Sequence, residues 1–356
     1  MIRFEKVSKV YDDGTTAVDA LDLEVPTGTL LALVGPSGCG KTTSLRMINR
    51  LIDPTSGTIT LDGMDVLSTD RVTLRRKIGY VIQHAGLFPH RTVVDNVAAL
   101  PRLLGGDRRT TRTRALELLE IVGLDDRFAD RYPWQLSGGQ QQRVGVARAL
   151  ATDPPFLLMD EPFSAVDPIV RAQLQDEFLR LQAEIGKTIV MVTHDIDEAL
   201  KLGDHVAVLR TGGILAQYGT PMELLTAPVD TFVSDFVGAA RGYRALGFER
   251  LPDDARVTAH APVKIGDSLA GRGWTVVVDD DGCPLGWVDG TTAATATGDA
   301  LRKTSRFLGR SASARDLLDG ALASPGGTVG IVDEAGVFVG VLSAAAVLDT
   351  AQGAAA

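Results

Sequence analysis

The sequence has little cysteine, few aromatic residues and no long apolar run. Cys39 and Cys283 are the two cysteines among 356 residues, too few for a disulfide framework and typical of a reducing compartment. Aromatic residues make up 5% and the formal net charge is −9, which argues against nucleic acid as a partner because phosphate backbones attract basic and stacking side chains. No run approaches the ~18 apolar residues that cross a bilayer. The first 14 residues carry frequent charges, so we expect no signal peptide.

Glycine, in contrast, is abundant, with 38 residues, and we expect some of it in tight loops.

The length of the chain predicts two or three domains, at about 150 residues per domain. Residues 1–240 alternate short β-rich runs with helical patterns, which predicts a mainly parallel α/β sheet. Apolar runs at 30–34, 156–159 and 188–192 are typical of buried strands. A mostly helical stretch separates the first two of these runs, and we expect a helical subdomain at about 87–150.

An internal repeat lies in the last part of the chain. We expect a linker at 241–262 and a second domain at 263–356. Residues 276–289 (VVVDDDGCPLGWVD) align without gaps to residues 330–343 (GIVDEAGVFVGVLS), and each copy resembles a strand, a tight turn and a second strand. Two ordinary β-hairpins would give the same Asp and Gly pattern, but matching apolar flanks favour a duplicated unit.

A glycine-rich loop carries the clearest chemical signal. Residues 35–42 (GPSGCGKT) fit the P-loop pattern G-x-x-x-x-G-K-[ST], between an apolar run and a helical stretch at 41–51. The backbone N–H groups of such a loop surround phosphate oxygens, Lys41 supplies charge to the β and γ phosphates, and the Thr42 hydroxyl can bind Mg²⁺. We interpret Cys39 as a small filler of the loop.

Two carboxylates follow the apolar run at 156–159. Asp160 is placed to hold the coordination shell of Mg²⁺. Glu161 can orient or deprotonate a water molecule aimed at the γ-phosphate. A solvated acidic turn is the alternative, but a P-loop requires a metal ligand of this kind.

The segment 136–140 (LSGGQ) completes a recognisable order: P-loop, LSGGQ, then LLMDEP. This order resembles that of an ABC-type ATPase, which implies a P-loop α/β fold with a helical subdomain, and ATP and Mg²⁺ as cofactors. By this resemblance Tyr11 stacks on adenine, Gln83 links the γ-phosphate to the membrane partner, and His194 contacts the γ-phosphate. Residues 164–167 (SAVD) match the D-loop, with Val166 where the family usually has Leu.

The resemblance assigns three sets of residues. Nucleotide binding is expected from Tyr11, Gly35, Pro36, Ser37, Gly38, Cys39, Gly40, Lys41, Thr42, Thr43, Ser137, Gly138, Gly139, Gln140 and Asp167. Catalytic roles are expected for Lys41, Gln83, Glu161 and His194, and metal binding for Thr42, Gln83 and Asp160. In the family, head-to-tail dimers place ATP between the P-loop of one subunit and LSGGQ of the other, so Ser137 and Gly139 would act in trans in a homodimer or a pair with a paralogue.

Residues 1–245 resemble more narrowly the ATPase subunit of importers for quaternary amine osmoprotectants such as glycine betaine, carnitine and choline. The stretches MINRLIDPTSGTI, LRRKIGYVIQHAGLFPH and DFVGAARGYRAL carry this resemblance. It implies permease subunits in the membrane and an extracytoplasmic substrate-binding protein as partners, with this chain at the cytoplasmic face. We expect the helical insertion, with the loop from Gln83 to Asn96 at its edge, to dock a short cytoplasmic helix of the permease.

The repeat resembles a tandem pair of CBS modules, which implies a small α+β domain. The spacing from Asp267 to Asp279 is shorter than that from Asp316 to Asp333, so we expect the first copy to have lost much of a helix. The stretches GWVDGTTA and GVLSAAAV lack the Asp with which adenosine-binding modules hold ribose. We therefore expect no tight adenosine nucleotide at this pair.

Three alternatives stay open at this point. The importer could carry another small solute, because substrate choice belongs to the partner proteins. A non-transport ABC ATPase of DNA repair would interrupt its core with long coiled coils, and a ribosomal one would carry two cores; this sequence shows neither. A nucleotide-binding module without turnover would lack the residues of hydrolysis, whereas Glu161 and His194 are present.

Overall fold

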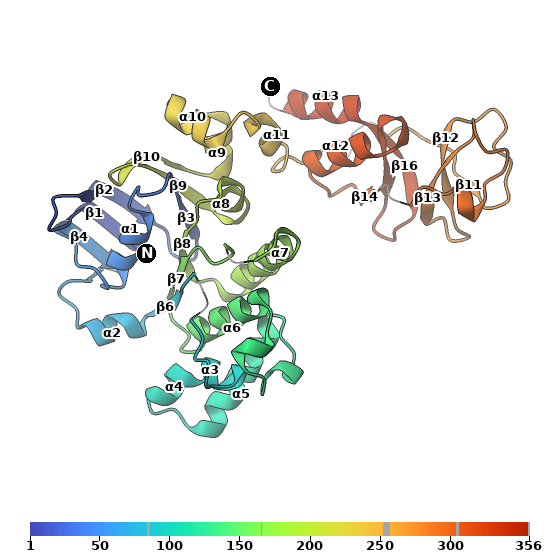
Figure 1. Ribbon diagram of the computed structural model, residues 1–356. Helices are drawn as coiled ribbons and strands as arrows, with labels where there is room; N and C mark the ends of the chain where they lie inside the picture. The colour runs from blue at the N-terminus through green and yellow to red at the C-terminus, as the bar shows by residue number, and fades with distance from the viewer. Residues whose placement is uncertain (84–85, 165, 252–256, 304–305, 355–356) are drawn as a thin grey trace. The chain divides into compact units, whose positions relative to one another are not determined.

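The computed structural model divides the chain into two compact units, Met1–Val237 and Gly238–Ala356 (Figure 1). It describes residues 1–83, 86–164, 166–251, 257–303 and 306–354. Parts of four predicted features therefore lie outside the described residues, namely His84 and Ala85 of the permease-docking loop, Ala165 of the D-loop, residues 252–256 of the linker, and residues 304–305 and 355–356 of the repeat domain. No helix of the described chain is long and apolar enough to span a membrane.

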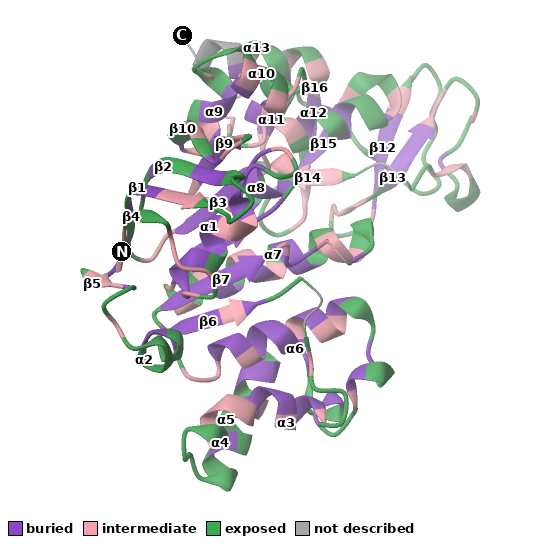
Figure 2. Cartoon of the chain, turned by 60° about the vertical axis from the view of Figure 1, so that its left-hand side comes forward, coloured by how far each residue is buried: buried purple, intermediate pink, exposed green. Residues whose placement is uncertain are grey.

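The first unit is built on a six-stranded sheet with the order β10-β9-β3-β8-β7-β6. Its strands are β3 (Leu30–Val34), β6 (Ile78–Val81), β7 (Phe156–Asp160), β8 (Thr188–Val192), β9 (His205–Arg210) and β10 (Ile214–Gly219). All neighbours pair in parallel except β10, which is antiparallel to β9. Every residue of β3, β7 and β8 is buried (Figure 2), as continuous apolar strands covered on both faces must be. The predicted parallel sheet is confirmed.

A second, antiparallel sheet has the order β2-β1-β4-β5 and was not predicted. Its strands are β1 (Ile2–Val10), β2 (Thr16–Val25), β4 (Ser56–Leu61) and β5 (Met64–Asp65). Along much of β1 and β2, buried and exposed residues alternate, which is the pattern of a sheet with one solvated face. The buried face shares a core with α1 (Lys41–Ile48) and with β3. The helix predicted at 41–51 therefore ends three residues early, with Asn49 as its C-cap.

Helices cover the parallel sheet and extend from it as a subdomain. The unit contains α2 (Arg71–Arg76), α3 (Val93–Val97), α4 (Ala99–Leu103), α5 (Arg108–Ile121), α6 (Gly138–Leu150), α7 (Pro168–Ile185), α8 (Ile196–Leu202), α9 (Pro221–Thr226) and α10 (Thr231–Val237). Short 3₁₀ turns lie at Asp126–Phe128 and Pro133–Gln135. The helices α3 to α6 follow β6 and precede β7, so the predicted helical insertion is present. Their apolar residues pack on one another, with Ala115, Leu118 and Leu119 of α5 buried.

The second unit contains two small sheets of the same design. One has the order β11-β12-β13 and the other β14-β15-β16; in each, the first pair is parallel and the second antiparallel. The elements are α11 (Arg241–Ala245), β11 (Val263–Lys264), β12 (Trp274–Val278), β13 (Pro284–Asp289), β14 (Phe307–Gly309), α12 (Ala314–Ala323), β15 (Thr328–Val332), β16 (Phe338–Ser343) and α13 (Ala344–Ala354), with 3₁₀ turns at Gly298–Ala300 and Pro325–Gly327.

The two hairpins repeat one another in register and in turn chemistry. Val278 pairs with Pro284 and Val332 with Phe338, each after a register shift at the same place in its copy. The Asp279 carboxylate accepts hydrogen bonds from the backbone N–H groups two and four residues on, and the Asp333 carboxylate does the same. The duplicated unit predicted from the sequence is therefore confirmed.

The copies differ in their helices. In the second copy, α12 and α13 cover one face of the sheet with a core that includes Leu317, Val329 and Val347. In the first copy, residues 265–273 connect β11 to β12 and form no helix, which confirms the predicted loss. A smaller core of Val263, Leu269, Val277, Val288 and Ala296 takes its place.

The copies are joined by an exchange of short segments. Thr258, which precedes the first copy, pairs with Val341 in the second, and Arg302, which precedes the second, pairs with Trp287 in the first. Glycine is required beside each bridge, since a Cβ at Gly286 would lie 2.8 Å from the Arg302 carbonyl oxygen and one at Gly340 2.6 Å from that of Thr258. A further apolar cluster contains residues of both sheets: Val276, Val278, Trp287 and Val341, with Trp274, Phe307 and Phe338 packed against it.

Candidate functional site

The carboxyl ends of β3, β8, β7 and β6 carry the candidate site. In open α/β sheets, ligands bind beyond this edge of the strands. Gly35 follows β3 directly and Gly40 is the N-cap of α1, with a left-handed backbone. A Cβ at Gly40 would lie 2.2 Å from the Ala17 carbonyl oxygen, so glycine alone fits there. The loop thus directs the N-terminus of α1 toward the end of the sheet, as phosphate binding requires.

Lys41 lies within this loop and is 8% exposed. Its ammonium donates to the carbonyl oxygens of Gly35, at 2.8 Å, and Pro36, at 3.1 Å, and lies 3.6 Å from the Cys39 sulfur. Cys39 is fully buried, in agreement with its interpretation as a filler. These contacts fix a positive charge at the mouth of the loop.

Thr42 and Asp160 form the second part of the site. The Thr42 hydroxyl donates to Asp160 Oδ1 at 3.2 Å. Burial raises the pKa of the Asp160 carboxyl, against smaller opposing effects of the Thr42 and Tyr80 hydroxyls and the Arg46 charge. No motif in the sequence marks Tyr80 or Arg46. Only their positions could have indicated a role, because Tyr80 lies near the end of β6 and Arg46 lies on α1, the helix after the P-loop.

The third part brings Gln83, Glu161 and His194 together from the ends of three adjacent strands. Glu161 Oε2 accepts a hydrogen bond from the Gln83 amide at 2.9 Å and lies 3.4 Å from His194 Nδ1. Glu161 has a left-handed backbone, with φ of 46°, which is strained for a residue with a side chain. Its N–H donates to the Val192 carbonyl, and its own carbonyl accepts from the Ser164 hydroxyl. These bonds hold the carboxylate toward the other two side chains.

Tyr11 and Thr43 extend the site past the P-loop. Tyr11 follows β1 and is 39% exposed. Its hydroxyl lies 3.4 Å from Thr43 Oγ1, and Lys9 Nζ lies 5.3 Å from the centre of its ring. An exposed aromatic face therefore stands beside the start of α1, where a base could stack.

The LSGGQ segment lies at the start of α6. Ser137 is its N-cap and forms a capping box with Gln140: the Gln140 N–H donates to Ser137 Oγ, and the Ser137 N–H donates to Gln140 Oε1. Asp167 caps α7 through the Val170 N–H. Among the residues described, no hydrogen bond or ion pair joins 137–140 to the P-loop. The structure therefore groups Tyr11, the P-loop, Gln83, Asp160, Glu161 and His194, and sets LSGGQ and Asp167 apart from them.

Comparison with known proteins matches this arrangement. Residues 18–164 match the ABC transporter family. The chain is 42% identical to the glycine betaine/carnitine/choline transport ATP-binding protein OpuCA of Bacillus subtilis (strain 168), over 98% of this chain and 96% of that protein. It is 45% identical to the osmoprotectant import ATP-binding protein OsmV of Salmonella typhimurium, over 96% of this chain and 94% of that one. The chain belongs to the ABC transporter ATP-binding proteins.

Solved structures agree with this assignment. The ATP-binding cassette MJ0796, in a dimeric post-hydrolysis state bound to ADP and Pi, is 36% identical with a TM-score of 0.56, over 62% of this chain and 99% of that one. The ABC-type ATPase fold predicted from the motifs is thus confirmed, and the protein is an ATPase coupled to transport. Proteins of this family bind nucleotide.

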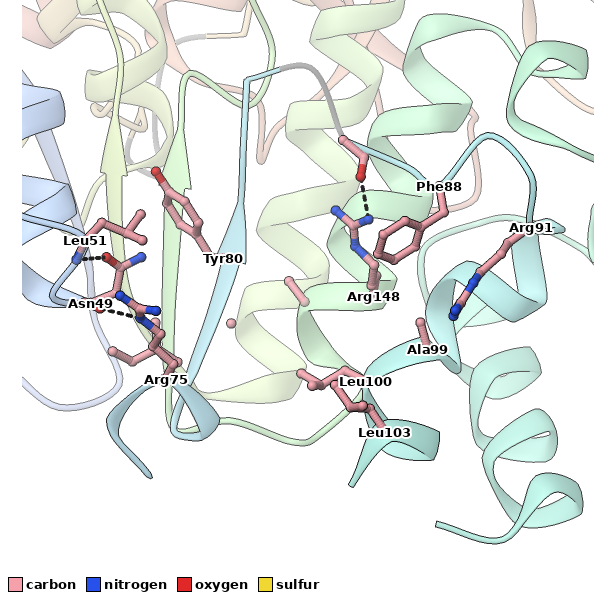
Figure 3. Close-up of a pocket in the computed structure, with 14 residues that line it drawn as sticks. Asn49, Leu51, Arg75, Tyr80, Phe88, Arg91, Ala99, Leu100, Leu103 and Arg148 are labelled. Carbon is pink, nitrogen blue, oxygen red and sulfur yellow. Dashed lines mark hydrogen bonds between the residues drawn. The ribbon is translucent and has the colours of Figure 1, made fainter. Parts of the chain in front are cut away.

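This ABC ATPase also carries a groove of about 550 Å³ beside the helical subdomain (Figure 3). Its walls are mainly apolar, and its lining includes Leu51, Ile78, Phe88, Leu100 and Leu103, with Arg75, Arg91 and Arg148 among them. The Phe88 ring lies between the guanidinium groups of Arg91, at 5.0 Å, and Arg148, at 5.9 Å. Arg148 also donates to the Gly86 carbonyl at 2.7 Å. The groove therefore combines apolar area with positive charge.

Asn96, which the sequence marked only as the end of the predicted docking loop, holds the loop of this groove. It is fully buried on α3. Its Oδ1 accepts from the Phe88 N–H at 2.7 Å, and its Nδ2 lies within 3.1 Å of the carbonyl oxygens of Phe88, Arg91 and Thr92. A single amide thus fixes the segment from Phe88 to Thr92. The one hint in the sequence is that Asn96 stands among the valines of a short apolar helix, where a polar side chain needs hydrogen-bond partners.

Proposed function

We propose that this ABC ATPase drives the import of a quaternary amine osmoprotectant such as glycine betaine, carnitine or choline. The observation that carries the proposal is the extent of the similarity to OpuCA, which covers 98% of this chain and so includes the C-terminal unit as well as the ATPase unit. An ATPase core alone would be shared with importers of many solutes.

Mg²⁺ is the metal that the donor set fits. Hydroxyl and carboxylate oxygens suit a hard cation, and the Thr42 and Asp160 oxygens lie 3.2 Å apart. Because burial raises the Asp160 pKa, a cation there would relieve the cost of an ionised carboxylate. When bound, Mg²⁺ would neutralise charge on the β and γ phosphates. The Gln83 amide oxygen is the third proposed ligand.

Hydrolysis is assigned to Glu161. Its carboxylate would accept a proton from the attacking water, while the His194 imidazole, 3.4 Å away, would contact the γ-phosphate. Gln83 donates to the same carboxylate and would orient it. Lys41 and the loop around it would hold the β and γ phosphates, and Tyr11 would stack on the adenine.

A head-to-tail homodimer would complete the site. The start of α6 offers backbone N–H groups and a positive dipole end, and residues 137–140 lie apart from the P-loop of their own chain. Each ATP would therefore meet Ser137, Gly138, Gly139 and Gln140 of the other subunit.

The groove is the proposed docking site of the permease. Its apolar walls suit the apolar face of a short helix, and Arg75, Arg91 and Arg148 suit an acidic residue on that helix. Gln83 would sense the γ-phosphate while the loop from Gly86 to Asn96 follows the permease. The further proposed partner is an extracytoplasmic substrate-binding protein. We propose that this chain lies on the opposite, cytoplasmic face of the membrane, bound to the permease.

Uptake measurements test the transported solute. Cells without their own osmoprotectant uptake would express the chain with the permease and binding protein that co-purify with it. We expect uptake of labelled glycine betaine, carnitine or choline that is lost with Glu161→Gln. Glu161-dependent uptake of an unrelated solute, with none of these three, would refute the quaternary amine assignment and leave the ATPase assignment intact.

Cross-linking tests the docking site. Cysteines introduced at Leu87 or His90 should capture the permease in the assembled complex. Ile214→Cys is the matched control, since β10 lies at the opposite edge of the sheet from β6 and Ile214 is exposed. Capture from Ile214 alone would place the permease elsewhere.

A further inference from the structure

Arg171 joins two segments that the proposed mechanism treats separately. It lies in the first turns of α7, directly after the D-loop, and its Nη2 donates to the Val166 carbonyl at 2.9 Å. Its Nη1 lies 3.8 Å from Asp195 Oδ2. Asp195 follows His194 in the chain. One guanidinium therefore contacts both the D-loop backbone and the residue after the histidine of the active site.

The Val166 end of this link touches the LSGGQ segment of the same chain. A Cβ at Gly139 would lie 3.2 Å from Val170 Cγ1 and 3.7 Å from Val166 Cγ1. The start of α6 is thus packed directly on the D-loop and the first turn of α7. A displacement of Gly139 cannot leave Val166 where it is, because packed cores do not deform continuously.

The Asp195 end of the link is held to α8 and to Thr193, the residue directly after β8. Asp195 Oδ1 accepts from the Asp197 and Glu198 N–H groups at the start of α8, and its own N–H donates to Thr193 Oγ1. A second contact between α7 and α8 lies four residues further along α7, where Gln175 Nε2 donates a hydrogen bond to the buried Glu198 at 3.1 Å. Residues four apart share a helix face, so α7 holds the His194 segment at two points.

We infer that Arg171 is a positioning residue that couples the two ATP sites of the dimer. This inference rests on the proposed head-to-tail site. The LSGGQ half-site of a chain meets the partner's ATP, whereas His194 of that chain meets its own ATP. Gly139 packs beside Val166, Arg171 bonds Val166 and lies near Asp195, and Asp195 is joined to His194 by the peptide bond. Engagement of one ATP therefore biases the histidine at the other. The expected consequence is positive cooperativity in hydrolysis.

The experiment measures ATPase rate against ATP concentration with the full chain. Arg171→Met keeps much of the side chain's length and removes its charge and donors. We expect kcat to fall about tenfold, as loss of one charged hydrogen bond in the transition state allows, and the Hill coefficient to fall from above 1 to near 1. The half-saturating ATP concentration should change little, because Arg171 does not touch the P-loop. Arg171→Lys should recover part of kcat.

Asp195→Asn separates coupling from folding, since its amide oxygen can still cap α8 while the charge is lost. It should reproduce the loss of cooperativity, and the double variant should lose no more kcat than Arg171→Met alone, because both changes break one link. Arg180→Met, at an exposed position of the same helix, is the control and should match the wild type. Melting temperatures of all variants report on folding.

The outcomes distinguish this inference from the proposed function. A cooperative wild type together with an unchanged Hill coefficient and kcat in Arg171→Met would overturn the inference and leave the ATPase site intact. A double variant whose loss of kcat equals the product of the two single losses would also overturn the inference. A wild type with a Hill coefficient of 1 that still hydrolyses ATP would overturn the coupling alone, whereas a wild type that hydrolyses no ATP would overturn both.

Discussion

Glu161 is held by more contacts than an exposed carboxylate at a strand end requires. Its backbone is left-handed, its N–H and carbonyl are both bonded, and its carboxylate lies between Gln83 and His194. Strain of this kind costs on the order of 1–3 kcal/mol and persists only where surrounding structure fixes it. These contacts fix the orientation of the Glu161 carboxylate between Gln83 and His194, as a general base requires.

Glu161→Gln should bind ATP and nearly stop hydrolysis. The change keeps Asp160 and the P-loop and removes the base, whose contribution is about 10²–10⁴-fold. We expect turnover to fall at least about 100-fold and an ATP-bound dimer to accumulate, measured by phosphate release and size-exclusion chromatography. Glu184→Gln, on an exposed position of α7, should behave as the wild type. Wild-type turnover in Glu161→Gln would refute the assignment.

Lys41→Ala should have the opposite signature and weaken ATP binding itself. Its ammonium meets the phosphates in the ground state, and it also holds the loop through Gly35 and Pro36. Losing a charged contact of about 2–3 kcal/mol should weaken affinity about 30–150-fold. Titration with a fluorescent ATP analogue measures this. An unchanged affinity would remove Lys41 from the nucleotide site.

Glu198 predicts a dependence of stability on pH. Burial raises the pKa of this carboxyl, so the folded protein holds the Glu198 proton more tightly than the unfolded chain does. The resulting gain in the free energy of unfolding is complete at pH values below the unfolded pKa and is lost as the pH rises through the folded pKa. Glu198→Gln can keep the bond from Gln175 and cannot ionise. It should raise the melting temperature at pH 8, with a smaller gain at pH 5. Glu184→Gln should show no such trend, and a gain that is larger at pH 5 would contradict the sign.

At the residue scale, motif order predicted catalytic roles for Gln83, Glu161 and His194, and the structure places the three side chains together. Each follows a strand of one parallel sheet, so topology brings them to the same edge, and their roles stay a prediction. No individual role was predicted for Tyr80, Arg46, Asn96 or Arg171. Each acts on another protein group and not on ligand, and a single sequence carries no pattern for such contacts.

At the scale of the element, α3 is five residues long and is stabilised mainly by tertiary contacts. Asn96 supplies four hydrogen bonds to the loop in front of it, and Thr92 caps the helix through the Asp95 N–H. A helix this short has no stability of its own in water. The element and the docking groove beside it therefore depend on one buried amide.

Asn96→Ala should destabilise the ATPase unit. Buried backbone groups would lose their partners at about 1–3 kcal/mol each; a total of about 3 kcal/mol corresponds to a fall in melting temperature of roughly 6–12 °C. Asn96→Asp keeps the acceptor for the Phe88 N–H but turns a carboxylate toward three carbonyls, so it should be at least as destabilising. An Asp variant as stable as the wild type would show that the donor contacts matter little.

Elements with a continuous apolar core were predicted well, and the antiparallel sheet was not. The strands β3, β7 and β8 are visible as unbroken apolar runs because both their faces are covered. In β1 and β2 polar residues alternate with apolar ones and register shifts interrupt the pattern, so no clean alternation marks them. The early end of α1 at Ile48 is likewise not marked by glycine or proline, since the chain turns at Arg50, which has a left-handed backbone (φ 53°).

At the scale of the whole molecule, the division of the chain places every residue of the proposed ATP site in Met1–Val237. The second unit begins with the turn before α11, and the Arg315 N–H donates to the Leu246 carbonyl within it. A cut between the units therefore leaves every residue of the proposed ATP site on one piece of the chain.

Truncation after Val237 should leave basal ATPase activity largely intact and alter how transport responds to external conditions. A cut after Arg244 would instead leave α11 without its partner residues, so Val237 is the better end. Phosphate release measures the first effect and uptake under varied osmotic conditions the second. Loss of basal hydrolysis in a truncated chain that still melts cooperatively would show that the second unit takes part in the ATPase reaction.

The exchange of segments between the two copies has a consequence for synthesis. Thr258 must wait for Val341 before its bridge can form, and at 5–20 residues per second the ribosome needs roughly 4–17 s to make the intervening chain. Arg302, by contrast, emerges after its partner Trp287. The first copy can therefore form its bridge early, whereas the segment around Thr258 stays without its strand partner until the ribosome has made Val341. Stop codons or slow codons before Val341 would leave the Thr258 segment exposed and unpaired, a form that cellular proteases and chaperones can recognise.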